Sequence, residues 1–141
     1  MSDARTTIGR REWASIPEFG LINVKVKIDT GAYSSSIHAS LIEEKNGILY
    51  VIFLDPTHPN FQNTSYSFKK FRIKKVKSSN GIIQERYFIK TKIFLGQCKI
   101  STEISITQRN GMRYPILIGR KLLNNRFIID TSLKYTLNTN S

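Results

Sequence analysis

The chain has 141 residues, which is enough for one domain with its own core and too few for two lobes of ordinary size. Its 22 Lys and Arg against 10 Asp and Glu give a formal charge of +12, which favours an anionic partner such as nucleic acid, a membrane surface or an acidic peptide, although a solvated Lys-rich surface explains the surplus equally well. The single Cys98 excludes an internal disulfide, and no apolar run reaches the roughly 20 residues of a membrane-spanning helix, so we expect a cytoplasmic protein with no membrane partner.

The N-terminal part of the chain predicts two strands. Residues 1–7 are polar and expected to be loose, and the folded domain is expected over residues 8–137, before a loose tail at 138–141. The first predicted strand covers residues 8–15. The second covers residues 21–28, where apolar and polar side chains alternate as in a strand with one buried face.

The second strand delivers a carboxylate, Asp29, onto a turn opened by Thr30 and Gly31. Glycine permits the backbone conformations that such turns need. An Asp-Thr-Gly triplet on its own is also common in ordinary surface turns, so its meaning depends on the rest of the chain.

The middle of the chain predicts more strands and one clear loop. We expect a short helical turn within residues 37–44, a central strand at 48–54 and a loop at 55–60, where two prolines exclude regular structure. A basic strand follows at 66–76. Asn80-Gly81, between two extended runs, is typical of a tight two-residue hairpin turn.

The remaining elements are short. The pattern predicts strands at 84–95, 99–107, 116–118 and 127–129, a loop at 109–112 and a helical turn at 120–125. Many short strands with little helix predict an all-β fold, a small closed barrel with one short C-terminal helix.

Two motifs together resemble a known family. Asp29-Thr30-Gly31-Ala32, followed later by an apolar strand and Gly119-Arg120, resembles the retroviral-type aspartic peptidases, the retropepsins. Together with segments 9–13, 78–87 and 109–123, the chain is similar to the RimB-type bacterial proteins long labelled "ATP-dependent zinc protease". The resemblance covers residues 8–130 and implies a single-lobe retropepsin barrel.

The resemblance implies a role for each motif residue. Asp29 would be the catalytic carboxylate, and because one motif is present where two carboxylates are needed, the second would come from another copy in a homodimer. Thr30 would hydrogen-bond across that dimer, and Gly31 would let the backbone approach the substrate. The residues implied to support the active-site loop are Thr30, Gly31, Ala32, Ser35, Gly119 and Arg120.

One position departs from the viral pattern. Viral retropepsins usually place an acidic residue two positions beyond the glycine, where it pairs with the arginine of the Gly-Arg motif. This chain has Tyr33 there, so the partner of Arg120 stays open.

The hairpin at residues 78–87 stands where retropepsins carry the flap that closes over substrate. The candidate flap and substrate-binding residues are Ser79, Asn80, Gly81, Ile82 and Arg86. Lids are mobile loops that complete a site on closure. The alternative interpretation is an ordinary hairpin.

We expect neither metal nor nucleotide cofactor. The chain has only two histidines, lacks a His-Glu-x-x-His motif and lacks a Gly-rich phosphate loop. His38 is expected to be a packed, hydrogen-bonded residue rather than a ligand.

Two functions remain open. The first is a homodimeric aspartic endopeptidase that, by the resemblance, trims acidic polyglutamate tails such as the one that a glutamate ligase adds to a ribosomal protein. The second is a non-catalytic basic barrel that binds RNA or the ribosome. Tyr66, Phe68 and Phe71 are interleaved with lysines, but their alternation predicts inward packing rather than stacking on bases.

Overall fold

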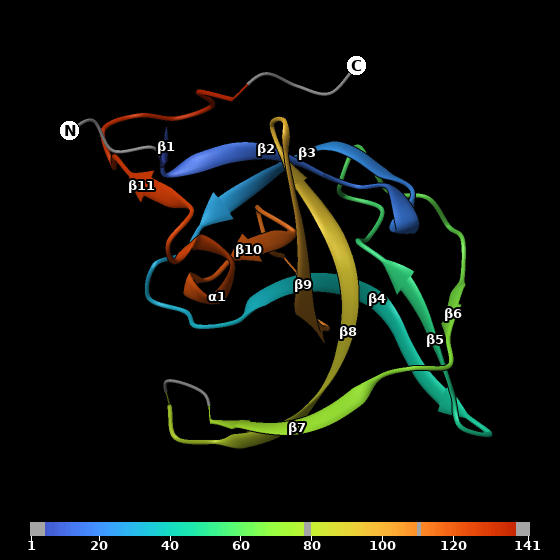
Figure 1. The fold of residues 1–141 in the computed structure, drawn as a ribbon. Helices are drawn as coiled ribbons and strands as arrows, with labels where there is room; N and C mark the ends of the chain where they lie inside the picture. Colours follow the sequence, from blue (N-terminus) through green and yellow to red (C-terminus); the bar gives the residue numbers. More distant parts are fainter. Residues whose placement is uncertain (1–4, 78–79, 110, 138–141) are drawn as a thin grey trace.

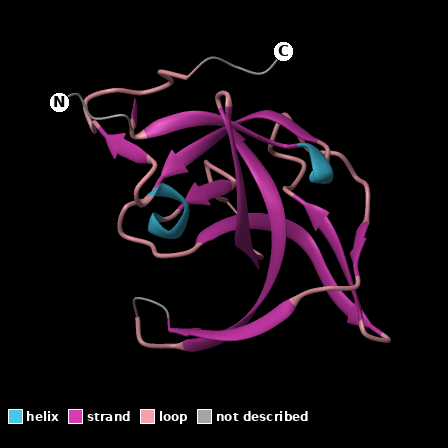
Figure 2. Ribbon diagram, viewed as in Figure 1, coloured by secondary structure: helices cyan, strands magenta, loops and turns pink. Residues whose placement is uncertain are grey.

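A computed structural model of the chain describes residues 5–77, 80–109 and 111–137, and within them it is mostly β-strand (Figures 1 and 2). Two short helical elements are present in these ranges, the 3-10 helix η1 (Pro17–Phe19) and the α-helix α1 (Arg120–Leu123). The strands are β1 (Thr6–Ile8), β2 (Arg11–Ile16), β3 (Leu21–Ile28), β4 (Ser35–Lys45), β5 (Ile48–Phe53), β6 (Tyr66–Phe68), β7 (Arg72–Lys77), β8 (Ile83–Leu95), β9 (Cys98–Thr107), β10 (Ile116–Ile118) and β11 (Phe127–Ile129).

Six strands close into a barrel, which confirms the predicted fold class. Neighbouring strands pair in the order β10, β3, β2, β8, β9 and β4, and β4 pairs back onto β10. β5 and β6 extend the sheet beyond β4, and β7 pairs with the first part of β8 to form a hairpin that projects from the barrel (Figure 1). Full closure leaves these six strands without a free edge.

The core fills the barrel, and in β3 the predicted alternation holds from Val24 onward, whereas Ile22 at the start of the strand is 48% exposed. In β3, Leu21, Val24, Val26 and Ile28 are buried and Lys25 and Lys27 are exposed. Ile89 and Ile104, which face each other across β8 and β9, are also buried. Each buried aliphatic side chain of this size contributes about 1.5–3 kcal/mol to folding.

Strand β10 lies between two strands that are consecutive in the chain. It pairs in parallel with β3, where Ile118 is opposite Ile28, and antiparallel with β4, where Ile116 is opposite Ile37. The segment that joins β3 to β4 must therefore pass around the end of β10. This insertion brings the Gly119-Arg120 motif against the Asp29 turn.

The two ends of the described chain meet beside the barrel. β1 pairs in parallel with β11, so Thr6 and Thr7 are in a strand and the prediction of a loose segment there is wrong for these two residues. The buried carboxylate of Glu12 accepts hydrogen bonds from the Gly9 N–H at 2.7 Å and from the Thr136 hydroxyl at 2.7 Å. Residues 1–4 and 138–141 of the predicted loose ends lie outside the described residues.

Several local predictions need correction. Residues 37–44 lie in β4, because their backbone pairs with β5 and β9 instead of forming a helical turn. β5 lies outside the closed barrel and is not central. The predicted basic strand breaks at 69–71 into β6 and β7, and the first predicted strand breaks after Ile8 into β1 and β2.

The hairpin turn is longer than Asn-Gly chemistry predicts. Lys77 pairs with Ile83, so the connection covers residues 78–82 instead of two residues. Gly81 has φ +85, a conformation that glycine adopts without strain. Within the described ranges, no helix has the length and apolar composition to cross a membrane.

Candidate functional site

Asp29 lies directly beyond β3, half-buried, on a turn held by its own backbone and side chain. Its N–H donates to the Ile118 carbonyl at 2.8 Å, so β10 fixes the point where the strand ends. Its Oδ1 accepts from the Gly31 N–H at 3.1 Å, and its carbonyl accepts from the Ala32 N–H at 3.2 Å. These bonds orient the carboxylate at the mouth of the turn.

The segment after β10 braces this turn from behind. The Arg120 N–H donates to the Ala32 carbonyl at 2.9 Å, and the Lys121 N–H donates to the Tyr33 carbonyl at 2.9 Å. The Gly119 N–H donates to the buried Ser35 hydroxyl at 3.0 Å. Residues about 90 positions apart therefore form one unit, and the structure brings the predicted support residues together.

Gly119 is needed because there is no room for a side chain. A Cβ at this position would lie 2.7 Å from the Ser34 carbonyl carbon and oxygen and 2.7 Å from the Tyr33 carbonyl oxygen. Backbone atoms of a paired loop cannot move away cheaply. Gly31 differs, because within the described part of the chain its Cβ would meet only Asp29 Oδ1, at 3.4 Å, an ordinary contact.

The Arg120 side chain contacts Thr30 and Tyr33. One guanidinium nitrogen of Arg120 donates to the Thr30 carbonyl at 2.9 Å. The guanidinium carbon also lies 5.9 Å from the centre of the Tyr33 ring, a cation–π distance. Arg120 therefore ties both ends of the turn with no acidic partner among the residues that the structure describes.

Thr30 and Gly31 are exposed at the surface of the turn. Their expected roles, a contact across a dimer and close approach of substrate, involve molecules beyond this chain and stay predictions.

The β7–β8 hairpin carries the predicted flap residues. Asn80, Gly81 and Ile82 are exposed, and Ile82 and Ile83 present apolar side chains that are 56% and 64% exposed. Ser79 lies outside the described residues. The hairpin end projects on the side of the barrel where Figure 1 shows α1 and the β3–β4 connection.

Arg86, on β8, faces a second cation. Burial, and then the positive charge of Arg109, holds the pKa of the Arg86 guanidinium below its usual value. Both arginines line one open groove together with Gln84, Gln108 and one acidic residue, Glu85. Two guanidinium groups that repel each other in one groove favour the binding of an anion there.

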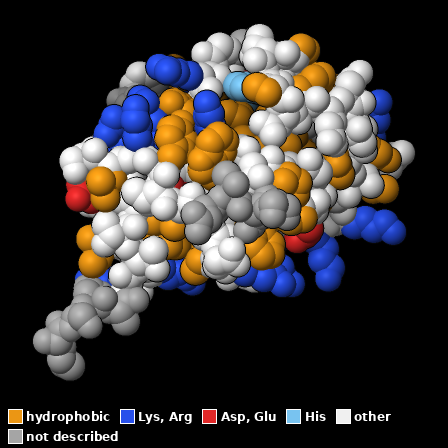
Figure 3. Space-filling model, turned by 90° about the horizontal axis from the view of Figure 1, so that it is seen from above, with side chains coloured by type: hydrophobic (Ala, Val, Ile, Leu, Met, Phe, Trp, Pro, Cys, Tyr) orange, Lys and Arg blue, Asp and Glu red, His pale blue; other side chains and the backbone are white. Residues whose placement is uncertain are grey.

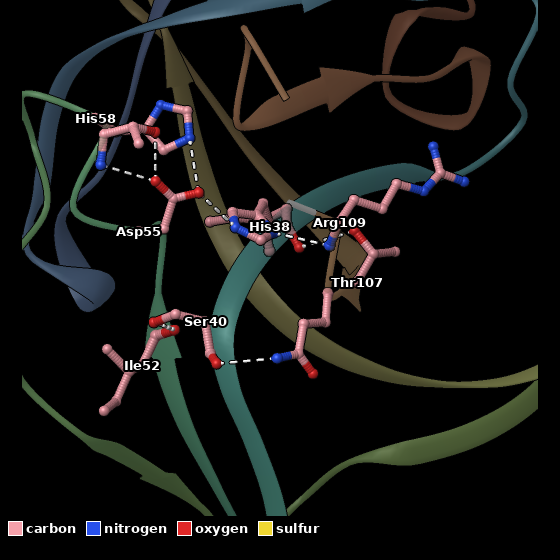
Figure 4. Close-up of polar contacts among 10 residues, drawn as sticks. His38, Ser40, Ile52, Asp55, His58, Thr107 and Arg109 are labelled. Atoms are coloured by element: carbon pink, nitrogen blue, oxygen red, sulfur yellow. Dashed lines mark hydrogen bonds and ion pairs between the residues drawn. The ribbon is translucent and has the colours of Figure 1, made fainter. Parts of the chain in front are cut away.

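Arg109 is held by a buried hydrogen-bonded chain that the sequence analysis only partly anticipated (Figure 4). Its backbone N–H donates to Nδ1 of the fully buried His38 at 3.0 Å, so Nε2 carries the His38 proton and donates to Asp55 Oδ2 at 2.8 Å. Asp55 Oδ1 accepts from the Thr57 N–H at 2.8 Å and from the Thr57 hydroxyl. The prediction of a packed, hydrogen-bonded His38 is confirmed.

A second network, around Glu103, was missed by the sequence analysis. The buried Glu103 carboxylate accepts from Arg72 Nε at 2.8 Å and Lys74 Nζ at 3.2 Å, and Lys121 Nζ lies 3.9 Å away. The Arg72 hydrogen bonds, and then those of Lys74, lower the pKa of Glu103 to about 2. Glu103 thereby links β7 of the hairpin to α1, next to the Asp29 turn.

Among the described residues, no group of three His, Cys, Asp or Glu side chains is arranged to hold a metal ion.

Comparison with known proteins identifies the family. The model of the RimB-like family, described as the retropepsin-like aspartic endopeptidase RimB, matches residues 7–140. A crystal structure of a Legionella pneumophila protein of unknown function has a TM-score of 0.71 and 28% identity, and the match covers 94% of this chain and 98% of that one.

Curated relatives are longer than this chain. Proteins named probable alpha-L-glutamate ligase from Shewanella halifaxensis and Desulfotalea psychrophila are 35% and 33% identical to it. The matches cover 97% and 95% of this chain but 31% and 30% of those proteins, so the chain spans about a third of their length. The family match over nearly the whole chain shows that the protein belongs to the RimB-like family of retropepsin-like aspartic endopeptidases.

Proposed function

We propose that this protein is an aspartic endopeptidase that acts as a homodimer and trims acidic, polyglutamate peptide tails such as that of a ribosomal protein. The observation that carries the proposal is the Asp29 turn, which β10, Gly119 and Arg120 hold rigidly at the end of β3. A preorganised carboxylate on a rigid element is what a catalytic group requires.

The chemistry needs a second carboxylate, and a two-fold axis supplies one. With Asp29 of each subunit close together, the two groups share one proton, because both cannot ionise cheaply. The charged carboxylate removes a proton from water as it attacks the peptide carbonyl, and the protonated one polarises that carbonyl. An isologous dimer has the required symmetry.

Charge supports an acidic substrate. The chain carries a formal charge of +12, and Arg86 and Arg109 line a groove beside the candidate flap. The relatives named probable alpha-L-glutamate ligase contain a segment similar to this chain, which supports a link to glutamate-extended peptides. The single Cys98, exposed on β9, suits the reducing cytoplasm that we propose as the location.

The competing function, a non-catalytic barrel that binds RNA or the ribosome, has weaker support. Tyr66, Phe68 and Phe71 are partly buried and pack against the hydrophobic core. Phe71 also contacts the Tyr87 ring edge-on at 5.6 Å. Rings engaged in this way are poorly available to stack on bases.

Two measurements test the proposal. Sedimentation at micromolar concentration should give a dimer, and cleavage of a glutamate-extended peptide should be abolished by Asp29→Asn and unaffected by a chelator. Cleavage that is lost with EDTA and returns with zinc would overturn the mechanism, and a monomer that cuts the peptide would overturn the shared site.

A further inference from the structure

A basic pocket lies outside the groove that contains Arg86 and Arg109. Five parts of the chain form its walls: β2, β3, the loop after β5, the loop before β10 and the C-terminal segment after β11. Four cationic side chains line it: Arg11, Lys25, Arg113 and Lys134. Of the described residues that line this pocket, none is Asp or Glu.

Three aromatic rings, those of Trp13, Tyr114 and Tyr135, also line the pocket, and a cation lies near each of them. Lys25 Nζ lies 5.6 Å from the centre of the Trp13 ring, and the Arg11 guanidinium lies 5.1 Å from the centre of the Tyr114 ring. The hydroxyl groups of Tyr114 and Tyr135 are hydrogen-bonded to each other. Figure 3 shows basic and hydrophobic side chains next to one another on the face seen from above.

This arrangement favours a carboxylate over a nucleobase. A base needs an open ring face on which to stack, and here Lys25 and Arg11 occupy positions over the Trp13 and Tyr114 rings. A carboxylate needs guanidinium and ammonium donors, which the pocket supplies without a competing acidic side chain.

The position of the pocket relates it to Asp29. Lys25 and Lys27 leave β3 on its exposed face, and Asp29 follows at the next alternate position, so all three belong to one row. Four residues of extended strand separate Lys25 from Asp29, or about 13 Å at about 3.3 Å per residue. An extended peptide at Asp29 therefore reaches the pocket about four residues from its scissile bond.

We propose that this pocket is an anion-binding subsite that takes a glutamate or aspartate side chain of the peptide substrate, about four residues from the bond that is cut. The inference rests on the proposed function for the identity of its occupant. Arg11 and Arg113 hold the carboxylate, and Lys25 and Lys134 add to the positive potential.

Trp13 offers a direct readout, because it is the only tryptophan in the chain and lines the pocket. Titration of Asp29→Asn protein with a hexaglutamate peptide should change Trp13 fluorescence saturably, and hexaglutamine should not. The double variant Arg11→Gln/Arg113→Gln should bind hexaglutamate at least tenfold more weakly. Lys90→Gln and Lys92→Gln remove the same charge from an exposed face elsewhere and should weaken binding less than threefold.

A second pair, Lys25→Gln and Lys134→Gln, keeps the test available if the arginine variants fail to fold, and it should weaken binding at least threefold. Silent Trp13 fluorescence, an equal loss in the Lys90 and Lys92 control, or a signal from an RNA oligonucleotide but not from hexaglutamate would overturn the inference. If the wild-type protein cleaves the glutamate-extended peptide but Trp13 fluorescence does not change on titration, this inference alone is overturned. If hexaglutamate changes Trp13 fluorescence but the wild-type protein does not cleave the peptide, the proposed function is overturned and the pocket remains a site that binds acidic peptides.

Discussion

Arg120 lies over the ring of Tyr33, with its guanidinium carbon 5.9 Å from the ring centre, and donates a hydrogen bond to the Thr30 carbonyl. This pair takes the place of the acidic partner that the Gly-Arg motif has in viral enzymes. The turn is thus braced through a ring and a carbonyl.

The first prediction is that the two side chains are energetically coupled. Arg120→Ala should lower the free energy of unfolding by about 1.5 kcal/mol, because it removes a hydrogen bond and a cation–π contact. Tyr33→Leu should lower the free energy of unfolding by about 0.5 kcal/mol. A double-mutant cycle measured by urea unfolding should give a coupling of about 0.5 kcal/mol, and strict additivity would show that the ring contact contributes nothing.

The second prediction concerns Gly119. Gly119→Ala should lower the free energy of unfolding by about 3 kcal/mol and remove cleavage, because the new Cβ would lie 2.7 Å from the backbone of Tyr33 and Ser34. Gly47→Ala is the matched control, since its φ of +75 costs about 1 kcal/mol but, apart from its chain neighbours, no atom of the described residues lies within 4 Å of the new Cβ. Equal melting temperatures for the two variants would contradict the crowding argument.

The third prediction is a pH dependence from Glu103. Its pKa in the folded protein is about 2, lowered from 4.5 chiefly by Arg72, so its ionised form stabilises the fold. That stability is present above about pH 4.5 and is lost as the pH falls toward about 2. Glu103→Gln should therefore lower the free energy of unfolding by about 1–2 kcal/mol at pH 7. The variant should also lose less stability than the wild-type protein as the pH falls.

Glu43→Gln is the control for Glu103, because Glu43 forms an exposed ion pair with Lys45 at 3.4 Å and should contribute less than about 0.5 kcal/mol. Urea unfolding at pH 7 and pH 3 checks both variants. A wild-type protein whose stability stays constant between these pH values would contradict the assigned role of Glu103.

The fourth prediction concerns substrate preference. Arg109→Gln should lower kcat/KM for an acidic peptide about tenfold and barely change it for a neutral one, because the neighbouring Arg86 would then stand alone in the groove. Lys90→Gln removes one exposed charge outside the groove and serves as the control. The difference in kcat/KM between the acidic and the neutral peptide should shrink at high salt. An equal effect of Arg109→Gln on both peptides would assign Arg109 a structural role.

The sequence predicted the framework of the site because that framework depends on local patterns. Alternation located β3 at residues 21–28, and the apolar run before Gly119 located β10 at 116–118, both with the bounds that the structure has. Turn chemistry correctly predicted the loop at 55–60. The family motifs then linked Asp29 to Gly119 across about 90 residues.

The missed features depend on contacts between distant segments. Residues 37–44 alternate between apolar and polar side chains only as far as Leu41 and then continue as Ile-Glu-Glu, so the pattern is too short to distinguish a helical turn from a strand, and the pairing with β5 and β9 decides it. Glu103 has no local signal, because Arg72 and Lys121 come from other elements. Arg109 was placed in a loop, but its support by His38 spans 71 residues.

The central claim is that Asp29 performs the chemistry. The most direct measurement is the rate of cleavage of a glutamate-extended peptide by wild-type protein and by Asp29→Asn, with circular dichroism and sedimentation to verify that both have the same fold and oligomeric state. We predict that the wild-type protein cuts the peptide and that the variant retains less than about a thousandth of the rate. A correctly folded Asp29→Asn protein that cuts as fast as wild type would contradict the account.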